Sequence, residues 1–498
     1  MSRINTNVQS LISRRALGAN NLSLNQALER LSTGLRINSG KDDPAGLIAS
    51  ETLRSGIRAI STAIDNANRA DTIVAVAEGG LQEVSSLLLE LESLVDSAAN
   101  EAGLTAEEVA ANQQQINDIL TSIDRLAEST AFGNKKLLNG SLAFTTSGIN
   151  ITQSTGAAVN HLSKVQVNAA KIPAGAFGNV SINVVKASKT AIVSAVAAGT
   201  TGTGTNQKNG TIAKATTIQI RGNFGSEIIS FASGTSVASI ASRINTSKEL
   251  TGVSATASAA TGGSQSLVFQ STSFGANAFV SVNVIENAST AFTAQATSVE
   301  KSGTNGTVTI NGSNAVVSGL DASVRAGSLA LDVTLTSAFG GTAGGTTNFQ
   351  VTGGGAVFSI SPTVGLSGQE TIGLSEVSSA KLGNAGIGFL ATLGSGLAND
   401  LSSNKFATAQ RIVRESINQI ATLRGRLGGF QKNTLETTIN SLNVARENVT
   451  AAESAIRDAD FAAETSALTR AQILVNASTT VLQLANSQPQ NALALLGR

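Results

Sequence analysis

Apolar residues at both ends of the chain recur at alternating spacings of three and four, which predicts long amphipathic helices with a coiled-coil-like seam. Ser39-Gly40 ends a first helix. Asp43-Pro44 begins a second, because aspartate favours the N-cap and proline the first helical position. The second helix is expected to reach about Asn100, with a soft point at Gly79-Gly80. The seam residues expected in these helices are Ile4, Val8, Leu11, Leu28, Leu31, Leu35, Ile57, Ile60 and Ile64.

A third N-terminal helix is expected to open at Thr105, since Thr105 and Glu108 have the spacing of a capping box. The C-terminal end repeats the helical pattern almost without a break from about Asn404 to Ala485. Gly428-Gly429 is expected to weaken or bend one turn, and Pro489 to limit the last helix. The seam residues expected here are Leu442, Val449, Ile456, Ile473 and Leu474.

Between residues 141 and 403 charged residues become sparse, and short runs rich in β-branched residues alternate with Gly, Ser, Thr and Asn. One short helix is expected at Ser236–Asn245. The expected strands are Val180–Val185, Thr216–Ile220, Leu267–Gln270, Phe279–Ile285, Thr307–Ile310 and Leu329–Leu335. The predicted fold is therefore α+β and multidomain: long terminal helices paired in coiled-coil-like bundles, with an inserted, mainly-β outer region.

Composition then argues against several classes of function. The net charge is +1 and no Lys/Arg-rich run exists, so neither nucleic acid nor an anionic membrane is an expected partner. No stretch of about 18 apolar residues was found, so no membrane insertion is expected. The chain has no cysteine and one histidine, His161, which leaves no thiolate, HExxH zinc site or His-dependent triad. We expect no enzyme activity, no metal and no cofactor.

The terminal helices need partners. In the first helix, burial of about eight seam residues contributes less than ordering about 35 residues costs, so the arm is marginal alone. We therefore expect the outermost arms to be disordered in a free subunit and to fold on assembly. Two readings of the periodicity remain open: contacts between copies that do not close and give an open helical filament, or an intramolecular bundle with an inserted domain.

Several segments closely resemble bacterial flagellin. At the N-terminal end these are Ile4–Asn7, Leu28–Ser39, Asp42–Gly46 and Asn66–Ala70. At the C-terminal end they are Ala455–Glu464, Leu468–Leu474, Ala485-Asn486 and Pro489–Asn491. The resemblance covers about residues 1–140 and 404–498. It implies a structural subunit that polymerises into the flagellar filament for swimming motility.

The resemblance also implies a layered organisation. Residues 1–43 with 458–498 would form an inner coiled-coil domain lining the filament channel, and residues 44–140 with 404–457 an outer tube. Residues 141–403 would be a variable, surface-exposed region, in which residues 216–258 resemble a module inserted in flagellins and hook proteins.

The implied partners are further copies of the chain, an export chaperone at the C-terminal helix, and filament cap and junction proteins. The implied localisation is secreted and extracellular, reached through type III export, which fits the absence of an apolar signal segment. Two alternatives stay open: a hook–filament junction protein, and a surface adhesin that displays the central region.

One segment departs from the family pattern. Many flagellins carry a basic and polar patch on the second long helix that animal Toll-like receptors bind. The corresponding residues here are Leu88, Glu90, Glu92 and Leu94, with glutamate where that pattern has arginine. Charge reversal opposes a receptor surface built for cations. We therefore expect weak recognition by that receptor.

Overall fold

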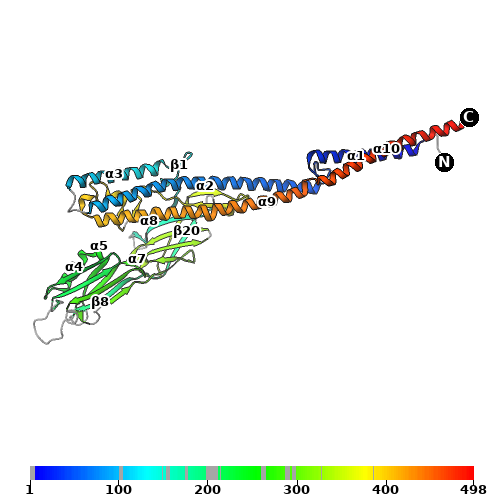
Figure 1. The fold of residues 1–498 in the computed structure, drawn as a ribbon. Coiled ribbons are helices and arrows are strands. Elements are labelled where there is room, and N and C mark those ends of the chain that lie inside the picture. The colour runs from blue at the N-terminus through cyan, green and yellow to red at the C-terminus, as the bar shows by residue number, and fades with distance from the viewer. Residues whose placement is uncertain are drawn as a thin grey trace. The chain divides into compact units, whose positions relative to one another are not determined.

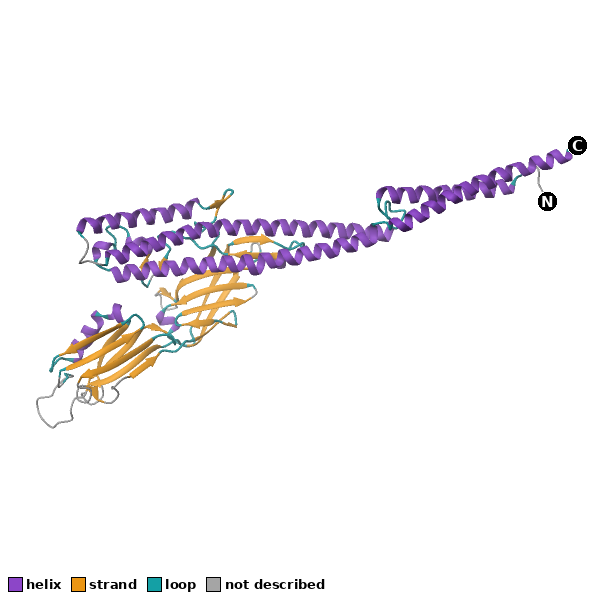
Figure 2. Cartoon of the chain, viewed as in Figure 1, coloured by secondary structure: helices purple, strands orange, loops and turns teal. Residues whose placement is uncertain are grey.

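The computed structural model describes residues 6–99, 105–148, 150–152, 158–173, 176, 178–197, 211–212, 215–259, 265–286, 292–293, 299–326, 328–384 and 386–497. The chain forms two compact units. The first contains Met1–Arg69, Ser359–Val364 and Lys432–Arg498, and the second contains Ala70–Phe358 and Gly365–Gln431. Helices dominate the first unit, whereas the second combines helices with β-sheets (Figure 2).

The first unit pairs helices from opposite ends of the chain. Helix α1 (Val8–Thr33) lies alongside α10 (Phe461–Leu496), as Figure 1 shows. The first part of α2 (Pro44–Ala98) packs on α9 (Thr437–Arg457). The expected start of α2 is present, because the Asp43 carboxylate accepts the Gly46 N–H at 2.9 Å.

In the second unit, the rest of α2 packs with α3 (Ala106–Ser129) and α8 (Phe406–Phe430). The expected capping box of α3 is present: Thr105 and Glu108 satisfy each other's backbone N–H groups. The core of this bundle includes Leu81, Leu88, Leu91, Ile116, Ile123, Ile412, Ile420 and Leu427. Polar contacts join the flanks of α2 and α8, including Glu92–Arg414 at 2.7 Å.

By length and composition alone, α2 is the one described helix that could cross a membrane. Its side chains Leu81, Leu88 and Val95 are fully buried against protein. That is how a core helix packs.

Helix α2 runs without a break through Gly79-Gly80, where a soft point is expected. Packing explains why residue 80 is a glycine. A Cβ atom at Gly80 would lie 2.7 Å from Thr130 Oγ1 and 3.0 Å from Leu138 Cδ1, whereas one at Gly79 would meet nothing within 4 Å. Gly80 therefore allows neighbouring side chains to approach the helix closely.

The C-terminal helices break at positions other than those predicted. Helix α8 continues through Gly428-Gly429, and the irregularity follows as a π-helical segment, η5 (Gln431–Glu436). The chain leaves the helix at Asp458, where ψ is 148°, and α10 begins at Phe461. Pro489 does not end α10, which runs on to Leu496.

The inserted region begins with a β-sandwich. One sheet has the order β17-β16-β7-β21-β3 and the other β18-β19-β20-β6. Alternate residues of both sheets fill a shared core that includes Val167, Ile182, Val308, Leu331 and Phe349. The strands are β3 (Phe144–Ser147), β6 (Leu162–Ala170), β7 (Gly178–Lys186), β16 (Thr307–Ile310), β17 (Ser313–Asn314), β18 (Val316–Ser318), β19 (Asp321–Ala326), β20 (Leu329–Leu335) and β21 (Thr346–Gly354).

A second sandwich is inserted into the first, between β7 and β16. Its sheets have the orders β10-β9-β13-β15 and β11-β12-β8-β14. Helix α4 (Val237–Thr246) contributes Val237, Ile240 and Ile244 to the core. The other elements are β8 (Thr190–Ala197), β9 (Thr216–Gly222), β10 (Ser226–Phe231), α5 (Lys248–Thr251), β11 (Val253–Ala259), β12 (Gln265–Phe274), β13 (Phe279–Glu286), β14 (Phe292–Thr293) and β15 (Val299–Ser302).

Short elements complete the described chain. These are β1 (Ala131–Phe132), β2 (Lys135–Lys136), β4 (Asn150–Thr152), β5 (Ala158–Asn160), α7 (Ser337–Gly340), β22 (Ala356–Ser359), η2 (Leu366–Gly368), β23 (Gln369–Ile372), β24 (Gly383–Asn384), β25 (Gly388–Phe389), η3 (Leu390–Leu393) and η4 (Leu401–Ser403). The predicted fold class is confirmed, and each of the six predicted strands lies within an observed one.

The two glycines of α2 provide a matched pair of substitutions. Gly79→Ala should stabilise the helical bundle by about 1 kcal/mol, the difference in helix propensity. Gly80→Ala should forfeit this gain, because its Cβ would displace Thr130 and Leu138. Thermal unfolding followed by circular dichroism at 222 nm measures both. Equal stabilisation by the two variants would contradict the packing role of Gly80.

Candidate assembly interface

The fully buried side chains of α1 and α10 are small. Where side chains are described in these two helices, the buried ones are Ser13, Ala27, Ala471 and Ala485. Small residues permit close approach of two helices, but they remove little apolar surface from water. The pair therefore gains little hydrophobic stabilisation from its own contact.

Many large apolar side chains of the same helices are exposed. Leu11 is 56% exposed and Ile473 is 62% exposed. Among the described side chains of α1 and α10, the exposed large apolar residues are Val8, Leu11, Ile12, Leu22, Leu28, Phe461, Ile473, Leu474, Val481 and Leu484. We call this set the outward aliphatic face. Apolar surface gathered in this way is typical of a binding interface.

The structure places the predicted seam residues in three groups. Ile4 lies outside the described residues. The outward aliphatic face contains Val8, Leu11, Leu28, Ile473 and Leu474. Half-buried positions are occupied by Leu31, Leu35, Ile57 and Ile456. The last group packs across a helix pair, in a cluster of α2 and α9 that contains Ile60, Ile64, Leu442 and Val449.

Polar contacts connect α1 with α10 along its length. The Ser10 hydroxyl donates to Asn486 Oδ1 at 2.7 Å, and Asn20 Nδ2 donates to Ser478 Oγ at 2.7 Å. Near the other end of α1, Arg30 and Glu464 form an ion pair at 3.1 Å. Partner numbers fall as residue numbers rise, so the helices are antiparallel. Periodicity alone did not reveal these contacts, because polar residues are not part of the apolar pattern.

The end of α1 at Thr33 lies beside the break between α9 and α10. Gly34 adopts a left-handed conformation with φ of 72°, which favours glycine. Its carbonyl accepts the Ala459 N–H at 2.9 Å, and the Arg36 N–H donates to the Arg457 carbonyl at 2.7 Å. These backbone hydrogen bonds replace those that the helices lose at their breaks.

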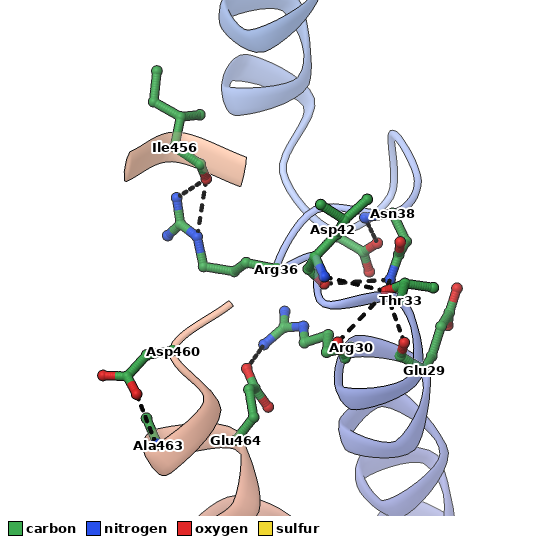
Figure 3. A network of polar contacts seen from close by, with 11 residues as sticks. Glu29, Arg30, Thr33, Arg36, Asn38, Asp42, Ile456, Asp460, Ala463 and Glu464 are labelled. Atoms are coloured by element: carbon green, nitrogen blue, oxygen red, sulfur yellow. Dashed lines mark hydrogen bonds and ion pairs between the residues drawn. The ribbon is translucent and has the colours of Figure 1, made fainter. Parts of the chain in front are cut away.

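Side chains reinforce this turn (Figure 3). Arg36 Nη2 donates to the Ile456 carbonyl at 2.6 Å, and Arg36 Nε donates to it at 3.2 Å. The Asp460 carboxylate accepts the Ala462 and Ala463 N–H groups and so caps the start of α10. A cation therefore lies at the end of α9 and an anion at the start of α10, as helix dipoles favour.

A short loop between α1 and α2 is organised by Asp42. Its carboxylate accepts the Ser39 N–H at 2.9 Å, the Ser39 hydroxyl at 3.0 Å and the Asn38 N–H at 3.3 Å. The hydrogen bond from the Ser39 backbone, followed by that from its hydroxyl, lowers the pKa of Asp42 below its ordinary 3.8.

The predicted receptor segment on α2 is only partly at the surface. Leu88 is fully buried in the bundle core, and Leu94 packs against that core. Glu90 is exposed. Glu92 is paired with Arg414, which partly balances its charge.

Among the residues that the structure describes, no group of three or more His, Asp or Glu side chains could hold a metal ion. His161 is buried and stacks on Phe339, with ring centroids 4.6 Å apart. This is the placement of a packing residue.

Together, the outward aliphatic face and the weak internal contact of α1 and α10 define a subunit that assembles through its paired ends. Comparison with known families agrees with this class. Residues 4–143 match the bacterial flagellin N-terminal helical region, and residues 411–496 match the bacterial flagellin C-terminal helical region. Residues 217–273 match the flagellin hook IN motif, at the place where an inserted module was expected.

Individual proteins that are similar to this chain are named flagellins. Flagellin E of Vibrio cholerae is 39% identical over 178 residues, which span 36% of this chain and 46% of that protein. B-type flagellin of Pseudomonas aeruginosa is 29% identical over 99% of both chains. Among solved structures, the flagellar hook associated protein-3 of Legionella pneumophila is similar, with 12% identity, 81% of this chain and 97% of that chain covered, and a TM-score of 0.29. The chain belongs to the bacterial flagellin family.

The Asp42 loop yields a titration prediction. An NMR titration of the Asp42 carboxyl should give a pKa below 3.8, and Ser39→Ala should raise it only part of the way, since the backbone donor remains. A carboxyl with a lowered pKa stabilises the fold above its unfolded pKa and ceases to do so as the pH falls through the folded pKa. The loop should therefore loosen only in acid. An Asp42 pKa that Ser39→Ala leaves unchanged would contradict this assignment.

Proposed function

We propose that the protein is a structural subunit that polymerises into the bacterial flagellar filament and serves swimming motility without catalysis. The observation that carries the proposal is the outward aliphatic face of α1 and α10. One copy leaves this face exposed, with Leu22 at 71% and Leu484 at 62%. Further copies of the chain can, and contacts that repeat without closing give an open helix.

Within the filament, residues 1–43 with 458–498 form the inner layer around the channel, and residues 44–140 with 404–457 form the layer outside it. Residues 141–403 project from these layers and are the displayed region. Flagellin-named relatives that align over the whole chain favour this role over a hook–filament junction protein or an adhesin.

The same helices account for partners outside the filament. The protein is secreted through the flagellar export apparatus, and an export chaperone binds α10. The exposed apolar residues of α10, among them Phe461 and Val481, give a chaperone the apolar surface that helix-in-groove binding needs. Cap and junction proteins meet the ends of the polymer.

Seeded polymerisation tests the main proposal. The double variant Leu11→Ser/Ile473→Ser removes two large apolar groups from the outward aliphatic face and should raise the critical concentration at least about tenfold, since each buried aliphatic side chain contributes roughly 1.5–3 kcal/mol. The control is Ile228→Ser, which alters a similarly exposed residue of β10. Pelleting and negative-stain microscopy measure assembly. Wild-type assembly by the double variant would overturn the proposal.

We further propose that Toll-like receptors recognise the protein weakly because Glu90 and Glu92 oppose a receptor surface built for cations. Glu90→Arg changes the exposed member of this pair and should increase receptor signalling several-fold in reporter cells. Glu83→Arg alters an exposed residue of the same helix outside the segment and serves as control. Full signalling by the unaltered protein would refute the proposal.

A further inference from the structure

One backbone carbonyl inside α10 has no donor within its own helix. In an α-helix the carbonyl of residue 485 accepts the N–H of residue 489. Residue 489 is proline, which has no backbone N–H, and it is the one proline of α10. The carbonyl of Ala485 is thereby left for another partner, at a residue that is buried.

Asn7 supplies that partner. Its Nδ2 donates to the Ala485 carbonyl at 2.8 Å, while its Oδ1 accepts the Ser10 N–H at 3.0 Å and so caps the start of α1. One side chain thus completes two helices. Asparagine suits both tasks because its amide offers an acceptor together with two donors, whereas aspartate would offer acceptors only.

This hydrogen bond can select the register of α1 against α10. The fully buried side chains, such as Ser13, Ala27 and Ala471, are small, so their burial distinguishes one register from the next only weakly. Polar contacts then decide the register, as single polar residues do in coiled coils. The slip of one turn that brings Asn20 opposite Leu482 would place Asn7 against the carbonyl of residue 489, which the N–H of residue 493 already occupies within the helix.

We propose that Asn7 and Pro489 form a register lock, in which the missing donor of Pro489 selects the one position on α10 where Asn7 binds. The lock rests on the proposed function. A slip of one turn moves the aliphatic residues of α10 by about 5.4 Å relative to those of α1. The outward aliphatic face would then no longer present one surface to neighbouring copies.

The chain contains no native cysteine, so engineered pairs report the register without background. Asn20→Cys with Ser478→Cys reports the native register, because these side chains are hydrogen-bonded. Asn20→Cys with Leu482→Cys reports a slip of one turn. Each pair is oxidised in the full-length protein after seeded assembly and in the unassembled protein, and the ratio of native to slipped disulfide is measured.

Asn7→Ser keeps a capping acceptor but loses the reach to Ala485, and it should lower this ratio roughly fivefold, as the loss of one hydrogen bond allows. Pro489→Ala should lower it similarly, because Ala485 regains its helical donor. Circular dichroism should show equal or higher helix content in this variant. The double variant should add little to either single one, since both remove the same interaction.

Unchanged ratios in both single variants would overturn the lock, as would additive losses in the double variant. A fall in helix content that accompanies the fall in ratio would also overturn it, since the two residues would then only support folding. Failure of every sample to assemble, with the wild type included, concerns the proposed function instead, and the ratio in the unassembled protein still tests the lock.

Discussion

The side chains fully buried in the antiparallel contact of α1 and α10 are too small to stabilise it strongly, and the assembly of the subunit depends on this constraint. Ala27 and Ala471 are buried where leucines would lie in a self-sufficient coiled coil. Leu11 and Ile473 are exposed instead, and Leu31 is only half-buried. The two ends of the chain are therefore joined to each other chiefly by polar contacts, and their apolar surface is left for other copies.

At both ends of α1, hydrogen bonds with specific geometry hold the helix to the C-terminal segment. At the turn between α1 and α2, the Gly34 carbonyl and the Arg36 N–H reach the opposite chain segment at Ala459 and Arg457. At the far end of the pair, Asn7 reaches Ala485. Both ends of α1 are thus fixed to the C-terminal segment by geometry-specific contacts. A contact with little apolar burial needs such contacts to hold a single register.

The sequence predicted what local chemistry determines and missed what packing determines. The start of α2 at Asp43-Pro44, the capping box at Thr105, and strands β16 and β20 follow from propensity and spacing, and the structure has them. The same rules predict that Gly80 and Pro489 weaken or limit their helices. Gly80 instead accommodates Thr130, and Pro489 lies within α10. Periodicity also found the aliphatic residues Leu11 and Ile473 but could not tell which partner covers them.

Hydroxyl-radical footprinting of free and polymerised protein tests the central claim most directly, because aliphatic side chains are labelled according to their exposure. We expect Val8, Leu11, Ile473 and Leu474 to lose most of their labelling on polymerisation, while the exposed Ile228 of the displayed region keeps it. Undiminished labelling of these four residues in the polymer would contradict the claim that neighbouring copies cover the paired ends.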